Sequence, residues 1–488
     1  YSKNVKSIKF GKNVSNIKLY NVYFQNLEKI EVDSENQTYL SNNNCVIKRS
    51  SDPNYKTIAL GCKTSIIPND CKITIGDFAF ANSNIQSINI PANVIVISSS
   101  AFAYCNDLLS FEVDSENTNF RVVNNCLIYN YIVSKGSSPI GVVRSATKNS
   151  TIPTDSDINY FDTYTFTGID IKEVNIPSNI SRLYLADTDS FCFKDSGVEK
   201  ITFDANSTIT DLKKSMYNAS KLKEVHLPDA LTSLADSKNF FNGCVSLEKV
   251  YFNSKVSEYN YAAFKDCQNI NEIIVPSDNK NFKVSDDKFL ILVQNNGGTT
   301  YLARYFGNEE NLIANGALGI YEGCFAYNNK IKNVTFSKMI CSIENNSFAY
   351  SSLETFSFGE SEIDAVGTDM FNNCKNLKEI VLPDSVTTIN SGAFSNAKIE
   401  KLVISSSMAN IDSHAFNATE IGELEIDENN PNYIFKNGFI LTKDETTLIK
   451  GFPDKNGKID VPNTVKTINT NSLSYTTMLY LNIPSSVT

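Results

Sequence analysis

The sequence predicts a β-rich solenoid, that is, a right-handed stack of short parallel strands with an irregular or short helical convex side and four β-flap inserts. Three observations support this fold class. An apolar residue, usually Phe and in several copies preceded by Ala, recurs along the 488 residues, most often at spacings of 22 to 27. An alternating apolar pair follows each copy and often ends in Pro, and a small residue stands three places after many of the Phe residues. Self-similarity at a period of this length is typical of repeat proteins.

The recurring apolar residue, here called the anchor, can be followed along the whole chain. Eleven of its 14 copies are Phe. One copy cannot bury its own apolar face, so stability is expected to come from the stacking of neighbouring copies. Burial of each Phe ring is expected to contribute about 2–3 kcal/mol. The anchors are Val22, Phe80, Phe102, Phe166, Phe193, Met216, Phe241, Phe264, Phe325, Phe348, Phe371, Phe394, Phe416 and Leu473.

The alternating apolar pair after each anchor predicts a short strand. Ile88 and Ile90 are two residues apart, so their side chains point to the same face of an extended chain. Pro91 follows directly, and Pro cannot continue a hydrogen-bonded ladder. Every copy supplies one such strand in the same direction, so neighbouring copies are expected to pair in parallel, about 4.8 Å apart.

Four spacings between anchors are long, at 57 to 64 residues, and each indicates an insert within a single solenoid domain over residues 1–488. Three of the inserts begin alike, with Asp-Ser-Glu-Asn or Asp-Glu-Asn-Asn and then an aromatic residue. Short β-rich stretches follow, so two-stranded flaps or extra rungs are expected rather than separate domains. The inserts cover about 33–66, 114–151, 276–312 and 427–460, and the chain returns to inward-facing strand positions at Ile67, Ile152, Ile313 and Val461.

The first residues of the inserts carry clustered oxygen-bearing side chains. Such oxygens are suited to calcium, but the spaced series of ligands in a known calcium loop is missing. Short Asp and Asn side chains also stabilise turns by bonding to the backbone. Turn chemistry is therefore the favoured interpretation, and no metal site is expected.

The position three places after the anchor holds Cys in four copies and Ala, Ser, Thr or Asn in many others. A position that accepts these small side chains is a packing position, so buried structural thiols are expected there. The chain has 11 Cys and two His, without a Cys-x-x-Cys pair or zinc spacing, so neither a metal nor a cofactor is expected. A disulfide between two neighbouring copies, Cys244 and Cys267, stays open at this point. The four anchor cysteines are Cys105, Cys244, Cys267 and Cys374.

Several motifs make the sequence similar to a known family. They are the repeated Ala-Phe-x-x-Cys, the Leu-x-x-Ile-x-Ile-Pro tails, segments such as 383–389 with the form Pro-x-x-Val-x-x-Ile, and the insert that begins at Asp427. Together they resemble the BspA-like leucine-rich repeats over essentially the whole chain. The resemblance implies a leucine-rich-repeat solenoid in a secreted or surface-exposed, non-enzymatic protein that binds other proteins, often in adhesion.

Charge and hydropathy argue against several partners. Lys and Arg total 44 against 54 Asp and Glu, a net charge of −10, so no nucleic-acid partner is expected. No apolar run reaches the length of a membrane span, about 20 residues, so no membrane insertion is expected. The repeat pattern starts and stops in mid-copy, which indicates a fragment of a longer protein. A monomer is expected, located outside the cell or at its surface.

Solvent-facing strand positions are the candidate binding positions, because packing does not dictate them. Each copy has two, one before the first inward residue and one between the inward pair. The first positions alternate in charge along the stack, so a solvated ladder that pairs with itself is one interpretation. The second positions carry aromatic and β-branched residues, so a protein-binding patch is the other. The candidate protein-binding residues are Glu224, His226, Lys249, Tyr251, Glu272, Ile274, Val381 and Val403.

These observations favour a non-enzymatic protein-binding scaffold, with a host or neighbouring-cell surface protein or the extracellular matrix as its ligand. A carbohydrate or cell-wall binding module and a passive spacer that displays another domain are the alternatives, and the absence of Trp weighs against the first. No nucleophile elbow, zinc helix motif or phosphate loop is found, so no enzyme is expected. His226 has Glu224 two residues away but no evident nucleophile partner for catalysis.

Overall fold

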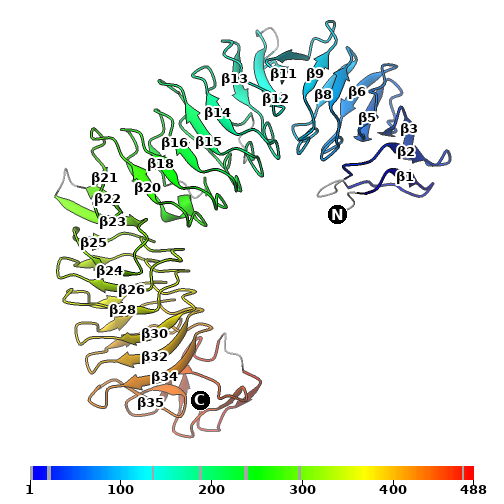
Figure 1. Cartoon of the computed structure of the whole chain (residues 1–488). Helices are drawn as coiled ribbons and strands as arrows, with labels where there is room; N and C mark the ends of the chain where they lie inside the picture. Colours follow the sequence, from blue (N-terminus) through cyan, green and yellow to red (C-terminus); the bar gives the residue numbers. More distant parts are fainter. Residues whose placement is uncertain are drawn as a thin grey trace. The chain divides into compact units, whose positions relative to one another are not determined.

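The computed structural model describes residues 4–18, 24–134, 137–185, 190–235, 240–294, 298–474 and 478–488. The chain forms two compact units, Tyr1–Val256 with Ala263–Ile270 and Ser257–Ala262 with Asn271–Thr488. Each unit is a stack of short strands joined by turns (Figure 1), and the only helix among the described residues is η1 (Tyr261–Phe264), a single 3-10 turn. The fold class is confirmed, while one continuous solenoid over residues 1–488 stays a prediction. The anchor Val22 lies outside the described residues.

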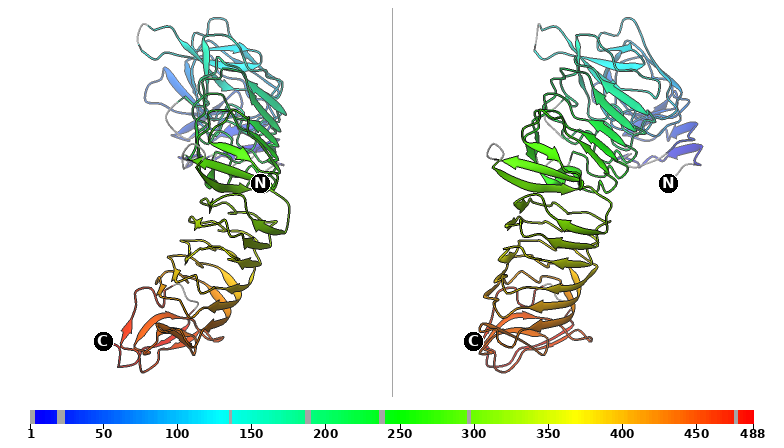
Figure 2. Two further views of the ribbon diagram at one scale, coloured as in Figure 1. Left: turned by 90° about the vertical axis from the view of Figure 1, so that its left-hand side faces the viewer. Right: turned by 60° about the vertical axis from the view of Figure 1, so that its left-hand side comes forward.

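The predicted Ile-x-Ile strands pair in parallel and form what we call the first ladder of each unit. In the first unit Val225 of β16 lies opposite Ile201 of β15 and Val250 of β18, and all three side chains are fully buried. Figure 2 shows the parallel strands of each unit following one another rung by rung. The inward and outward positions of these strands are therefore those that the alternating pattern predicts.

The first-ladder strands of the first unit are β1 (Ser7–Phe10), β2 (Lys29–Val32), β7 (Ser87–Ile90), β9 (Ser110–Val113), β14 (Glu173–Ile176), β15 (Lys200–Phe203), β16 (Glu224–His226) and β18 (Lys249–Tyr251). Strands with the same pattern in the second unit are β20 (Glu272–Ile274), β24 (Asn311–Ala314), β26 (Asn333–Phe336), β28 (Thr355–Ser357), β30 (Leu377–Val381), β32 (Lys398–Ile404), β34 (Glu420–Ile426), β38 (Lys458–Asp460) and β40 (Tyr480–Asn482).

A second ladder of shorter parallel strands follows later in each rung. Ile389 lies opposite Val366 on one side and Ile411 on the other, so the segment that begins at Pro383 supplies one of its strands. The strands at this place in the rung are β6 (Lys72–Ile75), β8 (Val94–Ile97), β13 (Ile158–Phe161), β17 (Ser233–Leu234), β19 (Glu258–Tyr259), β25 (Gly319–Ile320), β27 (Ser342–Ile343), β29 (Ala365–Val366), β31 (Thr388–Ile389), β33 (Asn410–Ile411) and β39 (Thr467–Ile468).

The anchor rings stack in the interior, as predicted. Every Phe anchor is buried. Phe325 and Phe348 are nearly parallel, at 3° with ring centroids 4.7 Å apart, and Phe371 stacks on Phe394 at 5.4 Å. In the first unit Phe166 and Phe193 are 5.2 Å apart at 5°. Each rung therefore covers the apolar face of the next.

A third set of cross-rung hydrogen bonds runs through the anchor turns. The backbone N–H of Phe348 donates to Met370 at 2.9 Å, and the N–H of Tyr350, two residues later, donates to Asn372 at 2.8 Å. The second bond requires the residue two places after the anchor to adopt a left-handed conformation. The residues at this position after the Phe anchors and Met216 all have positive φ, namely Asn82, Tyr104, Gly168, Asp195, Asn218, Gly243, Asp266, Tyr327, Tyr350, Asn373, Asn396 and Ala418.

Each insert contributes three strands rather than the predicted two. The first two form an antiparallel hairpin, and the third pairs antiparallel with the hairpin and in parallel with a second-ladder strand, as β37 does with β39. All four inserts have a register shift at the same place, after the second residue of the middle strand. The insert strands are β3 (Tyr39–Asn42), β4 (Cys45–Lys48), β5 (Tyr55–Leu60), β10 (Phe120–Val123), β11 (Cys126–Tyr131), β12 (Ile140–Ser145), β21 (Phe282–Val284), β22 (Phe289–Gln294), β23 (Thr299–Tyr305), β35 (Tyr433–Lys436), β36 (Phe439–Thr442) and β37 (Thr447–Gly451).

The return strand after the third insert lies one residue out of the predicted register. Pairing of β24 with β26 places Leu312 opposite the buried Val334 and Ile313 opposite Thr335. Ile313 is therefore 67% exposed instead of inward-facing. The inward pair is Leu312 and Ala314, and the small Ala at the second place hides the alternation in the sequence.

A buried Asn joins each of three inserts to the rung before it. The Asn430 amide donates to the carbonyls of Ser405 and Met408 at 3.0 and 3.1 Å, and its oxygen accepts the N–H groups of Asn432 and Tyr433, both at 2.8 Å. Asn36 and Asn117 make the same four bonds in the first and second inserts. The Asp three residues earlier accepts a backbone N–H within its own turn. The structure thus shows the predicted turn chemistry in these segments.

Replacing Asn430 by Asp should destabilise the second unit strongly. The isosteric carboxylate would lose two donors and place a buried charge beside two carbonyl oxygens, at a cost of about 2–4 kcal/mol in the free energy of unfolding. Asn410→Asp, at an exposed position of β33 in the same unit, is the control and should change stability by less than about 0.5 kcal/mol. Urea unfolding followed by circular dichroism measures both. Equal stability of the two variants would show that the buried amide is not what holds the insert.

Candidate functional site

Four of the candidate binding residues form one cluster on the outward face of β16 and β18 in the first unit. Glu224 lies opposite Lys249, and His226 lies opposite Tyr251. The His226 and Tyr251 rings stack at 13° with centroids 3.9 Å apart. His226 Nε2 is 2.9 Å from Glu224 Oε1. The side chains of this cluster therefore bind one another across the ladder.

The charged positions of the first ladder pair across rungs, as one of the two interpretations predicts. Lys200 lies 2.8 Å from Glu224, and hydrogen bonding to this Lys holds the pKa of Glu224 below its ordinary value. In the second unit Lys401 lies 2.8 Å from Glu425 and 3.5 Å from Glu423. Ion pairs of this exposure contribute about 0–1 kcal/mol each, so they set register more than stability.

The remaining candidates lie in the second unit. Glu272 and Ile274 are half-buried on β20, with the buried Ile273 between them. Val381 and Val403 lie opposite each other on β30 and β32, and Val381 is 50% exposed. On the next strand Val403 lies opposite Glu425. Val381 is thus exposed, with the half-buried Val403 beside it, on a face that also carries ion-paired side chains such as Lys401 and Glu425.

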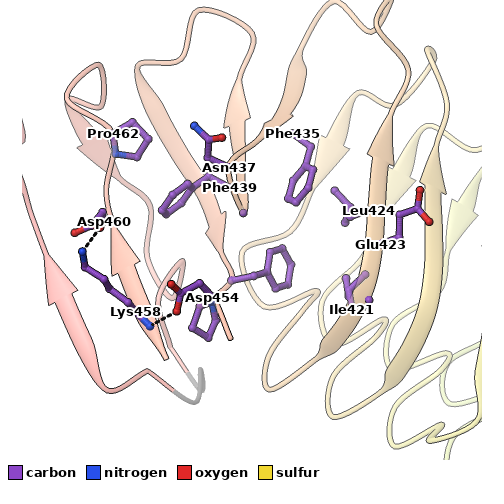
Figure 3. A pocket seen from close by; sticks show the side chains of 14 residues that line it. Ile421, Glu423, Leu424, Phe435, Asn437, Phe439, Asp454, Lys458, Asp460 and Pro462 are labelled. Atoms are coloured by element: carbon purple, nitrogen blue, oxygen red, sulfur yellow. Dashed lines mark hydrogen bonds and ion pairs between the residues drawn. The ribbon is translucent and has the colours of Figure 1, made fainter. Parts of the chain in front are cut away.

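Beside this face lies a cavity of about 720 Å³ that the sequence did not predict. It lies where the fourth insert separates β34 from β38. Figure 3 shows Leu424 on one side, Lys458 and Asp460 on the other, and Phe435 and Phe439 of the insert between them. The lining residues are Ile421, Gly422, Glu423, Leu424, Phe435, Asn437, Gly438, Phe439, Phe452, Pro453, Asp454, Lys458, Asp460 and Pro462.

No local motif marks this cavity in the sequence. Its aromatic residues lie in the insert and its acidic residues in the flanking strands, so they meet only after the ladder is assembled. The exposed Ile313 was missed for a different reason, because the expected register placed it inside. The one usable signal was the position of the insert, since a segment that interrupts the series of Ile-x-Ile strands must leave a gap in the ladder.

Among the residues that the structure describes, no group of three His, Cys, Asp or Glu is placed to hold a metal ion. In the same part of the chain, no apolar helix of membrane-spanning length is found. The His226 ring contacts the side chains of Glu224 and Tyr251.

The four anchor cysteines have one common role. Each thiol is buried and lies 3.1 Å from the carbonyl oxygen of the preceding anchor, to which it donates. Burial raises the pKa of Cys105 to about 12 and that of Cys374 to about 11. All eleven cysteines are free, so the Cys244–Cys267 disulfide is not formed. The small-residue position is thus also a hydrogen-bonding position.

A stack of parallel strands with a stacked Phe interior and paired surface charges defines the class of protein as a repeat scaffold. A sequence profile of the BspA type leucine rich repeat region, with six copies, matches residues 73–186, 186–286 and 308–442. These segments make up more than half of the chain, which therefore belongs to the BspA-type leucine-rich repeat family. Such repeats are generally non-catalytic.

Solved structures are also similar to this chain, and two of the three named here are described as leucine-rich proteins. A leucine rich cell surface protein from Faecalibacterium prausnitzii is 20% identical, with a TM-score of 0.47, over 81% of this chain and 96% of that chain. The pneumococcal vaccine antigen PcpA is 14% identical, with a TM-score of 0.37, over 91% and 98%. A leucine-rich repeat protein from Bacteroides ovatus is 15% identical, with a TM-score of 0.35, over 79% and 90%. Among curated proteins, no sequence match is found.

Alkylation at pH 8 should modify Cys341 in the folded protein and Cys374 only after unfolding. Cys341 is exposed, whereas Cys374 is buried and its raised pKa keeps it protonated. Because the pKa is raised, the stability that the thiol contributes is complete below about pH 8.5 and is lost as the pH rises toward about 11. Mass spectrometry of iodoacetamide-treated protein gives both rates. Similar rates at the two cysteines would mean that the anchor turn opens readily.

Proposed function

We propose that this chain is a non-enzymatic, protein-binding scaffold of a cell surface or secreted protein, and that it acts in adhesion to host or neighbouring-cell proteins. Membership of the BspA-type leucine-rich repeat family supports the scaffold role. The description of a similar protein as a cell surface protein supports the location. The ligand class proposed is a protein of the extracellular matrix or of a cell surface.

The observation that carries the proposal is the exposed Val381, which lies beside the half-buried Val403 on the outward face of β30 and β32. Val381 is half-exposed, whereas the neighbouring inward residues Ile380 and Leu402 are fully buried. Exposed apolar side chains surrounded by polar ones are typical of protein-binding surfaces. The first-unit cluster of Glu224, His226, Lys249 and Tyr251 is the second proposed contact surface.

Converting both valines to lysine should weaken protein binding by at least about tenfold, which corresponds to about 1.4 kcal/mol. The new charges would have to be desolvated against the partner. The matched control is Thr335→Lys/Ser357→Lys, because these two residues lie opposite each other at the same ladder positions. A panel of extracellular-matrix and cell-surface proteins, measured by surface plasmon resonance, provides the binding data, with circular dichroism as the test of folding.

Four outcomes would count against the valine pair as the contact surface or against protein binding itself. Binding that the valine variant and the control lose equally would indicate a general charge effect. Binding that survives in the valine variant but disappears in a His226→Ala/Tyr251→Ala variant would move the site to the first unit. Binding to glycans alone would favour a carbohydrate-binding module, and folded protein that binds nothing would favour a spacer.

A further inference from the structure

The fourth insert interrupts the first ladder and leaves a gap in it. β34 pairs with β32 and β38 pairs with β40, and each of these two sheets ends at the insert. Leu424 of β34 and Asp460 of β38 line the same cavity of about 720 Å³. The cavity therefore lies between two strand edges, as Figure 3 shows.

The backbone of β34 points into this gap. The N–H of Asp427 donates to Ile404 of β32 at 3.0 Å, and Ile426 is the residue that lies opposite Ile404. In a parallel pair, successive residues direct their N–H and C=O groups to opposite sides. Glu425 and Asp427 thus face β32, and the backbone groups of Leu424 and Ile426 face the gap.

Backbone groups of β38 also point into the gap. Val461 donates its N–H to Asn482 of β40 at 3.0 Å, so Asp460, one residue earlier, directs its backbone groups to the other side. The neighbouring Lys458 is already satisfied, because its N–H donates to Asp454 Oδ1 at 2.9 Å and its carbonyl accepts the N–H of Asp454 at 3.0 Å. The backbone groups of Asp460 are therefore the ones in β38 that can hydrogen-bond to an added strand.

In the first insert of the same chain, side chains of the insert itself accept hydrogen bonds from the corresponding strand edge. There the N–H of Ile30 donates to Asn44 Oδ1 at 3.4 Å, and the N–H of Val32 donates to Ser41 Oγ at 3.2 Å. Ile30 and Val32 correspond to Leu424 and Ile426 by their distance from the Asp that opens each insert. The residues that correspond to Asn44 and Ser41 are Gly438 and Phe435, which carry no side-chain acceptor.

We propose that the gap between β34 and β38 binds a short extended segment of a partner protein, which completes the first ladder as an added strand. The proposal deepens the proposed function and rests on it, since it names the kind of protein segment that is bound. Strand addition to an open sheet edge is an established way of binding peptides, in which backbone bonds give affinity and pockets for alternate side chains give specificity.

The lining of the cavity defines the chemistry of that segment. Phe435, Phe439 and Leu424 offer an apolar floor for every second side chain. The rim carries Glu423, Asp454 and Asp460, and its one cation, Lys458, is paired with Asp460 at 2.7 Å. The excess of carboxylates favours basic residues at the intervening positions. The ligand is thus an extended segment in which apolar and basic residues alternate.

The test uses the full chain and a fluorescein-labelled hexapeptide, acetyl-Lys-Val-Lys-Val-Lys-Val-amide. We expect saturable binding by fluorescence anisotropy, with slower amide hydrogen exchange in residues 423–427 of the bound protein. Gly438→Asn should weaken this binding at least about tenfold, because it supplies the acceptor that Asn44 supplies in the first insert. The backbone at Gly438 has φ +84°, a left-handed conformation that Asn tolerates better than most residues and that Asn44 adopts at φ 58°, and the new Cβ would lie 3.1 Å from the carbonyl oxygen of Phe452.

A matched control separates this effect from a general one. Gly316 also has φ +84° and open space around it, so Gly316→Asn should leave binding unchanged. Ladder residues with outward side chains direct their backbone groups to the preceding strand, as Asp427 does to β32, so the lysines of the hexapeptide would bond to β34. A hexapeptide N-methylated at its lysines cannot donate these bonds and should not bind. Equal binding of the methylated peptide, full binding by Gly438→Asn, or no binding of the parent peptide would each overturn the proposal.

The two proposals fail in different ways. If the hexapeptide binds as expected but no surface or matrix protein does, the strand-binding site is supported and the adhesion proposal is rejected. If such a protein binds through Val381 and Val403 while Gly438→Asn changes neither its binding nor that of the hexapeptide, the adhesive face stands and the strand site is overturned. Peptide binding retained in Val381→Lys/Val403→Lys would show that the cavity, and not the valine pair, holds the added strand.

Discussion

The stacking of the Phe anchors depends on one backbone constraint, the left-handed residue two places after each anchor. With that residue in place, two N–H groups of the turn reach the next rung, as those of Phe348 and Tyr350 do. Gly, Asn and Asp adopt this conformation readily, whereas Tyr104, Tyr327 and Tyr350 do so at a cost of about 1 kcal/mol each. The cost is offset because each turn completes the hydrogen bonds of its neighbour and seals a buried ring. The conformation of each rung is therefore stabilised by hydrogen bonds and ring contacts with the rungs beside it.

The inserts show how the stack tolerates interruption. The first ladder stops at β34, but the last strand of the insert, β37, pairs with β39 and carries the second ladder onward. The buried Asn430 joins the start of the insert to the preceding rung at the same time. An insert thus opens one face of the molecule while the remaining contacts of the rung are kept. The cavity and its unpaired strand edges form because the insert interrupts the first ladder while the second ladder continues.

The sequence predicted the parts of the fold that repeat and missed those that depend on assembly. Anchors, Ile-x-Ile strands and insert positions follow from periodicity, and Glu224, His226, Lys249 and Tyr251 form the expected outward cluster. The third strand of each insert was missed because its apolar run resembles the two before it. Ile313 was misplaced because Ala314 gives a weak inward signal. The cavity was invisible because Leu424, Phe439 and Asp460 converge only across separate strands.

The register shift is found at the same place in all four inserts, after Val46, Leu127, Leu290 and Ile440. A hairpin of this kind leaves its rung and rejoins it with the same geometry whatever residues its strands carry. Genetic exchange between copies could therefore transplant an insert from one rung to another, or duplicate it, and the neighbouring rungs would still close. Diversity at the gaps would then accumulate by shuffling of whole hairpins, which alters what the surface recognises while the Phe column beneath it stays the same.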